Sequence, residues 1–291
     1  MRVLHLDAGR EMRGGQWQVL RLMEGLTSQG VESTLLARAD SPLFEAARGR
    51  GCQVQPLSLV RVLLARRFDA VHAHDARGHT IAAMAGAKPL VVARRVAFEI
   101  RSAWKYARAQ RYIAVSHFVK SVLERGGVPA DRIDVVYDGV PVLDPSQGGA
   151  VVAPANADPL KGTTLALEAA RLAGVQLKLS SDPERDLQDA GIFVYISRSE
   201  GLGSGALLAM SAGVPVVASG VGGLPEIVEH RRTGLLVENE AGAIAEAIRE
   251  LRSDPSLAHR LGAEGRRRVQ EKFTVDHMVR RTMEVYRQVL S

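Results

Sequence analysis

Residues 197–215 read SRSEGLGSGALLAMSAGVP. The run follows an apolar segment, 192–196, which predicts a buried strand. Three glycines, at positions 201, 203 and 205, let the backbone turn and come close to a ligand. The apolar residues that follow predict a helix beginning near Ser204, and a helix start offers N–H groups and a positive dipole end to phosphate. A strand, a glycine-rich turn and a helix in this order are typical of doubly wound α/β folds.

Two interpretations fit this turn. In the first, Glu200 hydrogen-bonds to ligand hydroxyl groups while the helix start binds phosphate. In the second, the glycines form a tight turn that binds nothing, because glycine-rich turns are common without a ligand.

Strand and helix patterns alternate along the rest of the chain. Apolar runs predict strands at 3–6, 34–37, 53–57, 70–74, 89–93, 151–153, 177–180 and 214–218. Helical spacing of apolar residues predicts helices at 16–29, 42–50, 59–67, 78–85, 163–173, 204–212, 241–252, 256–272 and 275–290. This alternation predicts parallel sheets with helices on both faces.

The length of 291 residues suits two domains. A turn-rich stretch at 144–151 reads as a linker, and the alternation restarts after it. We therefore predict the α/β class, with two doubly wound, Rossmann-like domains facing a central cleft. The first spans 1–147, the second 151–272, and a terminal helix occupies 273–291. Ligands of such sheets bind at the carboxyl ends of the strands.

Composition excludes several classes of protein. Hydrophobic residues make up 46% of the chain and charged residues 24%, which is ordinary for a globular protein. The single cysteine, Cys52, excludes a disulfide-stapled scaffold. Asp7 interrupts the first apolar run, so we expect no signal peptide and a cytoplasmic location. Residues 1–145 contain 21 Lys and Arg against 14 Asp and Glu, whereas 146–291 contain 17 against 18. The first half is therefore expected to meet an anionic partner.

The run at 197–215 resembles the donor-site signature of the GT-B glycosyltransferases of family 4, also called group 1. Further segments similar to the family's motifs follow in the family's order along nearly the whole chain: Arg13-Gly14-Gly15, Tyr137-Asp138-Gly139-Val140, Leu160-Lys161-Gly162, 219–228 and 233–237. The resemblance implies the GT-B architecture, with an acceptor side in the first domain and a donor site in the second. It also implies that the terminal helix crosses back to the first domain.

The resemblance further implies transfer of a sugar from a nucleotide-sugar, with retention at the anomeric carbon. Glu200 would contact the donor sugar, Lys161 would neutralise the leaving diphosphate, and the amides of Gly203 and Ser204 would cradle its distal phosphate. A cation and a helix start would thus stabilise the departing charge. The predicted donor-binding positions are Gly14, Gly15, Asn156, Lys161, Glu200, Gly201, Leu202, Gly203, Ser204 and Leu208. We expect no metal and no cofactor, since the sequence has no Asp-x-Asp pair and the nucleotide-sugar is a co-substrate.

Two positions depart from the family's pattern. Leu208 stands where the family has the second glutamate of its pair, and Asn156 stands where it has an arginine. These departures favour an alternative function, in which a non-catalytic relative keeps the fold and binds a glycan, a nucleotide or a partner subunit.

His72 and His74 lie two residues apart in a predicted strand, so both imidazoles point to the same side. Three interpretations stay open: a metal site, for which no third or fourth ligand is visible nearby, a pair of structural histidines, and a contact to the donor sugar. The resemblance favours the last, with His74, nearer the strand end, as a catalytic residue beside Glu200 and Lys161.

Residues 94–111 hold six cations against one acid. Read as a helix, the segment places Arg101, Lys105 and Arg108 on one stripe, which predicts a basic amphipathic helix. Its face is either simply solvated, or docks on acidic lipid, or holds a phosphorylated acceptor. The predicted acceptor or membrane-surface residues are Arg94, Arg95, Arg101, Lys105 and Arg108. Nucleic acid is not expected, because no recognised binding motif is present.

The sequence thus predicts a glycosyltransferase that moves a sugar from a nucleotide-sugar to a glycan or (glyco)lipid acceptor, for example in lipopolysaccharide or other cell-surface glycan assembly. Its expected place is the cytoplasm, with peripheral contact to the inner face of the membrane.

Overall fold

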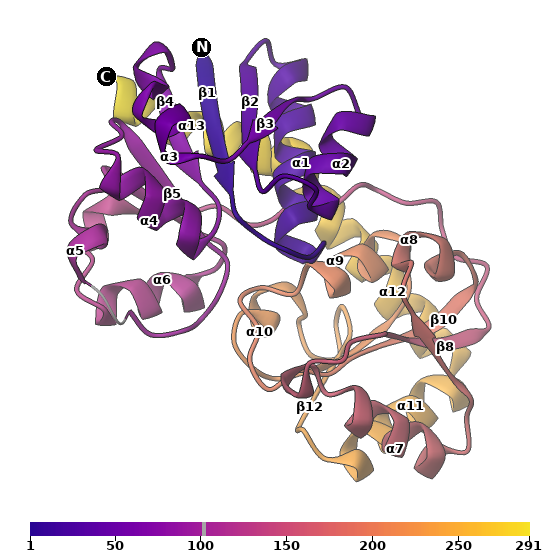
Figure 1. Ribbon diagram of the computed structural model, residues 1–291. Helices are drawn as coiled ribbons and strands as arrows, with labels where there is room; N and C mark the ends of the chain where they lie inside the picture. Colours follow the sequence, from indigo (N-terminus) through magenta and orange to yellow (C-terminus); the bar gives the residue numbers. More distant parts are fainter. Residues whose placement is uncertain (101–102) are drawn as a thin grey trace. The chain divides into compact units, whose positions relative to one another are not determined.

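The computed structural model describes residues 1–100 and 103–291. The chain divides into two compact units (Figure 1). Unit 1 consists of Met1–Gly139 and Val275–Ser291, and unit 2 of Val140–Thr274. Each unit is built around its own parallel sheet, as the alternation of strand and helix patterns predicted. The predicted cleft between the domains stays a prediction.

Unit 1 contains a seven-stranded sheet in the order β3-β2-β1-β4-β5-β6-β7. All of its neighbouring strands pair in parallel. The strands are β1 (Arg2–Asp7), β2 (Glu32–Ala37), β3 (Gln53–Pro56), β4 (Ala70–Ala73), β5 (Leu90–Arg94), β6 (Arg111–Ala114) and β7 (Ile133–Val135). The order reverses between β1 and β4, and a ligand of a doubly wound sheet binds at such a point, beyond the carboxyl ends of the strands.

The helices of unit 1 follow its strands along the chain. They are α1 (Gly14–Ser28), α2 (Pro42–Gly49), α3 (Leu59–Leu63), η1 (Ala65–Arg67), α4 (Ala76–Met84), α5 (Ala103–Tyr106), α6 (His117–Arg125), η2 (Ala130–Arg132) and α13 (Val275–Leu290), with η marking 3-10 helices. Although α13 is the last helix in sequence, it belongs to unit 1, where it packs on α1 and passes behind the strands in the view of Figure 1. Its buried side chains Met278, Val279 and Tyr286 share one core with Leu22 and Leu26, because residues three to four apart lie on one helix face.

Unit 2 contains a five-stranded parallel sheet in the order β12-β11-β10-β8-β9. Its strands are β8 (Ala150–Pro154), β9 (Leu177–Ser180), β10 (Ala190–Tyr195), β11 (Val216–Ser219) and β12 (Leu235–Val237). Its helices are η3 (Pro159–Lys161), α7 (Thr163–Ala173), α8 (Pro183–Asp186), η4 (Leu187–Asp189), α9 (Ser204–Ser211), α10 (Leu224–Ile227), α11 (Ala241–Ser253) and α12 (Pro255–Lys272). Small residues such as Ala166 and Ala169 of α7 pack against Val194 and Ile244 in its core.

The basic amphipathic helix predicted over 94–111 is wrong for the described residues. Arg94 ends β5 and Arg111 begins β6, so the two ends of the segment belong to neighbouring strands. Of the residues described between these two strands, only Ala103–Tyr106 form a helical turn. The spacing of the charges resembled a helix, but both ends of the segment pair as neighbouring strands of the sheet.

Among the residues that the structure describes, no helix combines the length and the apolar character needed to cross a membrane.

Candidate functional site

Residues 196–203 connect β10 to α9 in unit 2; Gly201 and Gly203 lie in this connection and Gly205 in the first turn of the helix. Gly203 has a φ of +107°, in the region that favours glycine, and it precedes α9 without a side-chain cap. The first turn of α9 contains no acidic residue. Because the first N–H groups of a helix have no acceptor within the helix, this start is suited to an anion.

A second glycine run, Gly222 and Gly223, lies directly against the segment that carries Glu200. The N–H of Gly223 donates a hydrogen bond to the carbonyl oxygen of Glu200 at 3.1 Å. A Cβ atom at either glycine would overlap with backbone atoms of Glu200 or Gly201. Because Gly222 and Gly223 have no side chains, the backbone of Glu200 and Gly201 can pack directly against them.

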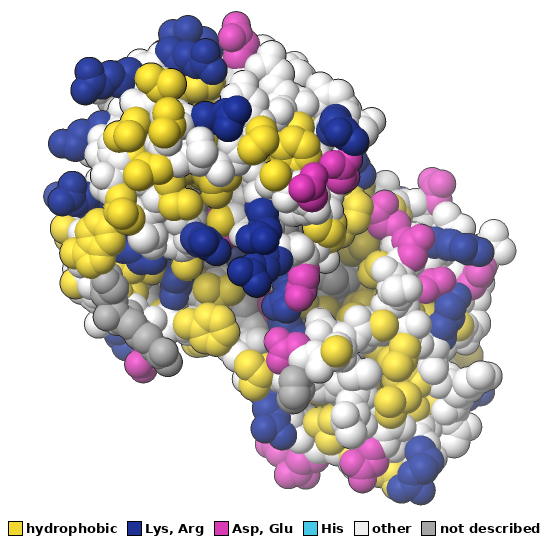
Figure 2. Space-filling view, in the orientation of Figure 1, with side chains coloured by type: hydrophobic (Ala, Val, Ile, Leu, Met, Phe, Trp, Pro, Cys, Tyr) yellow, Lys and Arg dark blue, Asp and Glu magenta, His cyan; other side chains and the backbone are white. Residues whose placement is uncertain are grey.

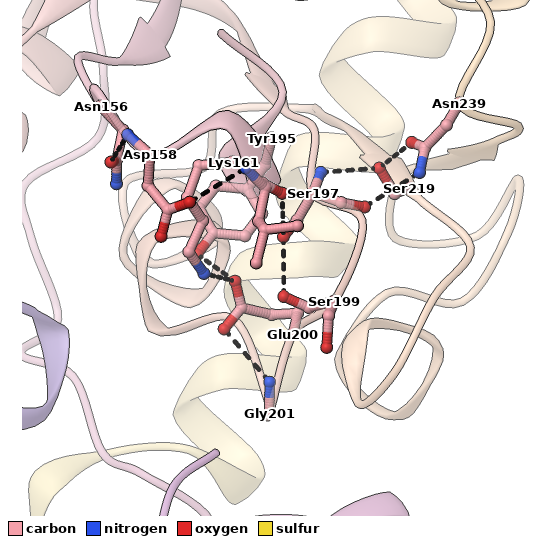
Figure 3. A network of polar contacts seen from close by, with 11 residues as sticks. Asn156, Asp158, Lys161, Tyr195, Ser197, Ser199, Glu200, Gly201, Ser219 and Asn239 are labelled. Carbon is pink, nitrogen blue, oxygen red and sulfur yellow. Dashed lines mark hydrogen bonds and ion pairs between the residues drawn. The ribbon is translucent and has the colours of Figure 1, made fainter. Parts of the chain in front are cut away.

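Lys161 and Glu200 form an ion pair beside this turn. The Nζ of Lys161 lies 2.7 Å from Oε2 of Glu200, and the two side chains are 31% and 13% exposed (Figure 3). The other carboxylate oxygen of Glu200 accepts the N–H of Gly201 at 3.2 Å. Two residues that the sequence assigned to different parts of a donor are thus in direct contact.

Tyr195, at the end of β10, also binds Glu200. Its hydroxyl group donates to Oε2 of Glu200 at 3.0 Å. Burial, and after it the nearby charge of Glu200, raise the pKa of Tyr195 well above its usual range, so the phenol stays protonated and can only donate to the carboxylate. Sequence reasoning missed this residue, although its position, five residues before Glu200 at a strand end, was a usable signal.

Two polar side chains hold the strand ends behind the turn. The hydroxyl of Ser219 accepts the N–H of Ser197 at 2.9 Å and donates to the side-chain oxygen of Asn239 at 2.6 Å. Asn239 in turn donates to the carbonyl oxygen of Ser197 at 3.0 Å (Figure 3). The carboxyl ends of β10 and β11 are therefore fixed to the segment after β12, which keeps the support of Glu200 rigid.

Asn156 has a local role in the turn before Lys161. Its side-chain oxygen accepts the N–H of Asp158 at 2.9 Å, and its carbonyl oxygen accepts the hydroxyl of Thr163 at 2.8 Å. The oxygen of the Asn156 side chain is thus already bonded to the backbone, and an amide brings no charge where the family has an arginine.

Leu202 and Leu208 are both buried, at 2% and 6% exposure. Leu208 lies on α9, whose residues from Ala206 to Ser211 are all buried. Their side chains therefore belong to the interior of unit 2, and from these two predicted donor-binding positions no side chain is presented to a ligand.

Three histidines, His5, His72 and His74, form one buried cluster in unit 1. His5 of β1 lies opposite His72 of β4, and the rings of His72 and His74 are 4.0 Å apart between centroids. Burial is the largest cause that lowers the pKa of His5 to about 3 and the pKa values of His72 and His74 well below their usual range. The cluster is therefore neutral at physiological pH.

His5 is the member that the sequence analysis missed. His5 is on β1, the strand next to β4, so the spacing of His72 and His74 in the sequence could not reveal it. One ligand atom from each ring lies within 4.8 Å of the others. The guanidinium group of Arg95 lies beside the cluster, and its positive charge disfavours a cation there.

Arg95 determines which nitrogens of the cluster carry protons. Its Nη1 lies 3.4 Å from Nδ1 of His74 and can only donate. The proton of His74 is then on Nε2, which faces Nδ1 of His5 at 2.9 Å. His72 contacts the hydroxyl of Tyr286 through its Nδ1 at 2.7 Å. The Nε2 atoms of His5 and His72 have no partner among the described residues.

Arg95 is not a free surface cation. Its Nε contacts Asp138 at 3.2 Å, with the two side chains 13% and 9% exposed. The start of α1 lies against it, since a Cβ on Gly15 would be 3.6 Å from the Cδ of Arg95, and Gly14 is the first residue of that helix. The structure thus brings His74, Arg95 and the first glycine loop together within unit 1.

The other residues predicted for an acceptor or membrane surface have mixed positions. Arg94 is buried and donates to Tyr106 and to the carbonyl oxygens of Val96 and Phe98. Lys105 donates to the carbonyl of Ala76 and to Thr80, at 3.1 Å each. Arg108 lies over the ring of Trp104. Arg101 lies outside the described residues. Of the described residues, Arg94 and Lys105 are thus held by contacts within unit 1, and the predicted stripe of Arg101, Lys105 and Arg108 stays a prediction.

Asp7 ends β1 beside the first glycine loop and was also missed. Its carboxylate accepts the N–H of Gly9 at 2.8 Å and the side-chain amide of Gln16 at 3.2 Å. Burial, and after it the charge of Asp75, raise its pKa to about 6. A carboxyl group that titrates near neutral pH is therefore present in unit 1.

Comparison with protein families matches both units. The model of glycosyl transferases group 1 matches residues 150–268, and that of Glycosyltransferase Family 4 matches residues 12–142. The chain belongs to the family 4, group 1 glycosyltransferases. Its two Rossmann-like parallel sheets are those of the GT-B architecture, and among similar solved structures is HepE from Anabaena in complex with UDP-glucose. That match has a TM-score of 0.87 and 17% identity, and covers 99% of this chain and 100% of the other.

Curated relatives of this family 4 chain match it over a part of their length. The alpha-maltose-1-phosphate synthase of Mycolicibacterium smegmatis is 43% identical over 110 residues, which is 35% of this chain and 28% of that protein. The GDP-mannose-dependent alpha-(1-6)-phosphatidylinositol monomannoside mannosyltransferase of Mycobacterium tuberculosis is 44% identical over 78 residues, 26% of this chain and 20% of that protein. The aligned stretches thus span less than a third of these relatives.

Proposed function

We propose that the chain is an enzyme that transfers a sugar from a nucleotide-sugar donor to a hydroxyl group of a glycan or lipid-linked acceptor. The observation that carries this proposal is the contact between Lys161 and Glu200, 2.7 Å apart, beside the uncapped start of α9. A cation, a carboxylate and a helix start are the three groups that a charged diphosphate joined to a hydroxyl-rich sugar requires.

The chemistry follows from these groups. The diphosphate of the donor binds to the Nζ of Lys161 and to the first N–H groups of α9. This binding breaks the ion pair between Lys161 and Glu200. Glu200, still held by Tyr195, then accepts hydrogen bonds from sugar hydroxyls. The bond between the anomeric carbon and the diphosphate oxygen breaks, the acceptor oxygen bonds to that carbon, and the proton of the acceptor hydroxyl group passes to the departing diphosphate. Lys161 and the helix start stabilise the negative charge of the departing diphosphate.

We propose further that the reaction retains the configuration of the anomeric carbon and needs no metal ion. The resemblance of the motifs to those of the family supports retention. Independence of metal is supported by Lys161 and α9, which supply positive charge where a divalent cation would otherwise be required. Addition of a chelator should then leave the initial rate unchanged.

The relatives support a nucleotide-sugar as the donor but do not agree on its nucleobase. HepE is described in complex with UDP-glucose, whereas the mycobacterial mannosyltransferase is described as GDP-mannose-dependent. The same mannosyltransferase acts on a phosphatidylinositol monomannoside, which supports a lipid-linked acceptor for this chain. This function belongs in the cytoplasm and, for a lipid-linked acceptor, at the inner face of the membrane.

A thermal-shift panel of UDP, GDP, ADP and their glucose and mannose conjugates, without added metal, tests the proposal. A ligand at about 100 times its dissociation constant stabilises the folded chain by about 2.7 kcal/mol. We expect a shift with one base, followed by turnover of its sugar conjugate with an acceptor. If a folded sample shows no shift with any nucleotide, the proposal fails. The non-catalytic relative, which Leu208 and Asn156 favour, then replaces it.

A further inference from the structure

A short apolar surface covers α3 and η1 in unit 1. Four large side chains of this segment point into solvent: Leu59, Val60, Leu63 and Leu64. Val60 is 65% exposed and Leu64 is 67% exposed, which are the two largest values among the exposed large hydrophobic residues of the described chain. Only Val62 and Ala65 face the interior. We call residues 59–67 the α3 surface.

Charge on this surface has one sign. Arg61, Arg66 and Arg67 are exposed between and after the leucines, and residues 57–68 contain no acidic residue. On α4, which packs beside α3, Arg77 is exposed as well, and Lys88 follows that helix. Figure 2 shows hydrophobic side chains bordered mainly by Lys and Arg over this part of unit 1.

The number of exposed apolar side chains on the α3 surface is unusual for a surface that faces only water. Single exposed apolar residues are normal, but four within six positions, framed by cations, mark a place where another surface binds. A helix with apolar side chains and arginines lies along a bilayer, with the apolar groups in the acyl boundary and the guanidinium groups at the phosphates.

We propose that the α3 surface binds anionic lipid bilayers. Charge complementarity favours this occupant, because the headgroup layer of an anionic membrane is uniformly negative, as the frame of the α3 surface is uniformly positive. A second copy of this chain is disfavoured, since a two-fold contact through this surface would place Arg66 and Arg67 against the same cations of its partner. The proposal concerns binding alone and does not rest on the transferase activity.

The surface differs from the segment that the sequence analysis assigned to the membrane. In 94–111, Arg94 and Arg95 are engaged inside unit 1, by backbone carbonyls and by Asp138. On the α3 surface the guanidinium groups are exposed; Arg61 contacts the carbonyl of Pro56, and Arg67 lies over the ring of Phe68. Neither contact neutralises the charge.

Co-sedimentation of the full chain with vesicles tests the proposal. One set of vesicles contains phosphatidylcholine alone, and the other contains phosphatidylcholine mixed with phosphatidylglycerol. We expect binding to the anionic vesicles to be about tenfold stronger and to weaken with salt. Equal binding to both sets, or none, would overturn the proposal.

Two double variants divide the surface into its parts. Val60→Ser with Leu64→Ser removes apolar groups, and Arg66→Glu with Arg67→Glu reverses charge. Each is expected to weaken binding to anionic vesicles by about tenfold. The residues are exposed, so the melting temperature should be unchanged, which is checked first.

Matched controls come from unit 2. Leu167 and Leu172 of α7 are 44% and 42% exposed, so their replacement by Ser removes comparable apolar area elsewhere. Arg171→Glu with Arg252→Glu makes the same change in net charge. These controls should bind as the unchanged chain does, and an equal loss in them would overturn the assignment to α3. Sedimentation velocity without lipid tests whether a second copy of the chain binds this surface instead. A dimer that is lost in the variant with Val60→Ser and Leu64→Ser would overturn the proposal and assign the surface to a second copy.

Discussion

The hydroxyl of Tyr195 and the Nζ of Lys161 both contact the same carboxylate oxygen of Glu200, at 3.0 and 2.7 Å. One partner carries a full charge and the other a neutral dipole. Under the proposed function, Lys161 exchanges Glu200 for the diphosphate of the donor, whereas Tyr195 keeps its hydrogen bond and holds the carboxylate in place.

Tyr195→Phe should lower the rate of sugar transfer and spare nucleotide binding. The phenyl ring keeps its stacking on Phe193, so the fold is retained. Loss of one hydrogen bond to a charged group costs about 1.5–3 kcal/mol, or roughly one to two orders of magnitude in rate if the bond persists in the transition state. Steady-state kinetics and calorimetric titration with the nucleotide diphosphate check this. A drop in affinity equal to the drop in rate would assign Tyr195 to the nucleotide instead.

Lys161→Ala should weaken binding of the nucleoside diphosphate much more than that of the nucleoside. The lysine offers its charge to phosphate only, and a charge-assisted contact is worth about 1.5–3 kcal/mol. Calorimetric titration with both ligands measures the difference. Lys178→Ala is the control, because Lys178 also pairs with a carboxylate of unit 2, Asp186, at 2.8 Å. Equal losses for both ligands in Lys161→Ala would remove Lys161 from the phosphate site.

Glu200→Gln should leave nucleotide binding intact and depress transfer. An amide can still accept from Tyr195, but it carries no charge to hold sugar hydroxyls, so we expect a loss of about tenfold or more. A coupled assay that detects the released nucleotide measures it. Glu246→Gln, an exposed position on α11, is the control for the lost charge. Transfer at the original rate would exclude Glu200 as a donor contact.

The sequence predicted the class of fold because strand and helix periods are local properties. It also predicted the glycine-rich turn before α9, since glycine is readable at single positions. The roles of Lys161 and Glu200 were implied by the resemblance to the family and stay predictions. The sequence did not predict that Lys161 and Glu200 pair, because they are 39 residues apart and meet only once β8 and β10 are neighbours. Local pattern does not contain that information.

The same reason explains the missed His5. Its partner His72 is on β4, and the two strands pair through the order β2-β1-β4, not through adjacency in the chain. The prediction for 94–111 was wrong for the opposite reason. The local pattern of charges favoured a helix, but the two ends of the segment pair in β5 and β6. Contacts between distant segments thus determine both the histidine cluster and the loop that holds Arg95.

The histidine cluster should destabilise unit 1 in acid. The pKa of His5 is lowered to about 3, and burial holds those of His72 and His74 well below their usual range. An unfolded imidazole binds a proton below about pH 6.5, whereas the folded cluster stays neutral. The contribution of the cluster to the free energy of unfolding is therefore largest above pH 6.5. It decreases as the pH is lowered below 6.5, by up to about 1.4 kcal/mol per pH unit for each imidazole.

Urea unfolding at several pH values measures this slope. Both tryptophans, Trp17 and Trp104, lie in unit 1, so their fluorescence reports on that unit. His5→Gln should make the slope shallower by about one proton, while His117→Gln, at an exposed position, serves as control. An unchanged slope in His5→Gln would show that His5 is protonated in the folded chain.

Asp7 should act on stability with the opposite sign. Its folded pKa of about 6 exceeds the ordinary value of 3.8, so the folded state holds a proton that the unfolded state has already lost between these values. The free energy of unfolding therefore falls as the pH rises through this window, by about 3 kcal/mol in total. Asp7→Asn keeps an acceptor oxygen for Gly9 and cannot ionise. It should be more stable than the unchanged chain above pH 6 and equal to it near pH 4, with the exposed Asp131→Asn as control. A variant that is less stable at every pH would mean that the hydrogen bonds of the ionised carboxylate to Gly9 and Gln16 outweigh its burial.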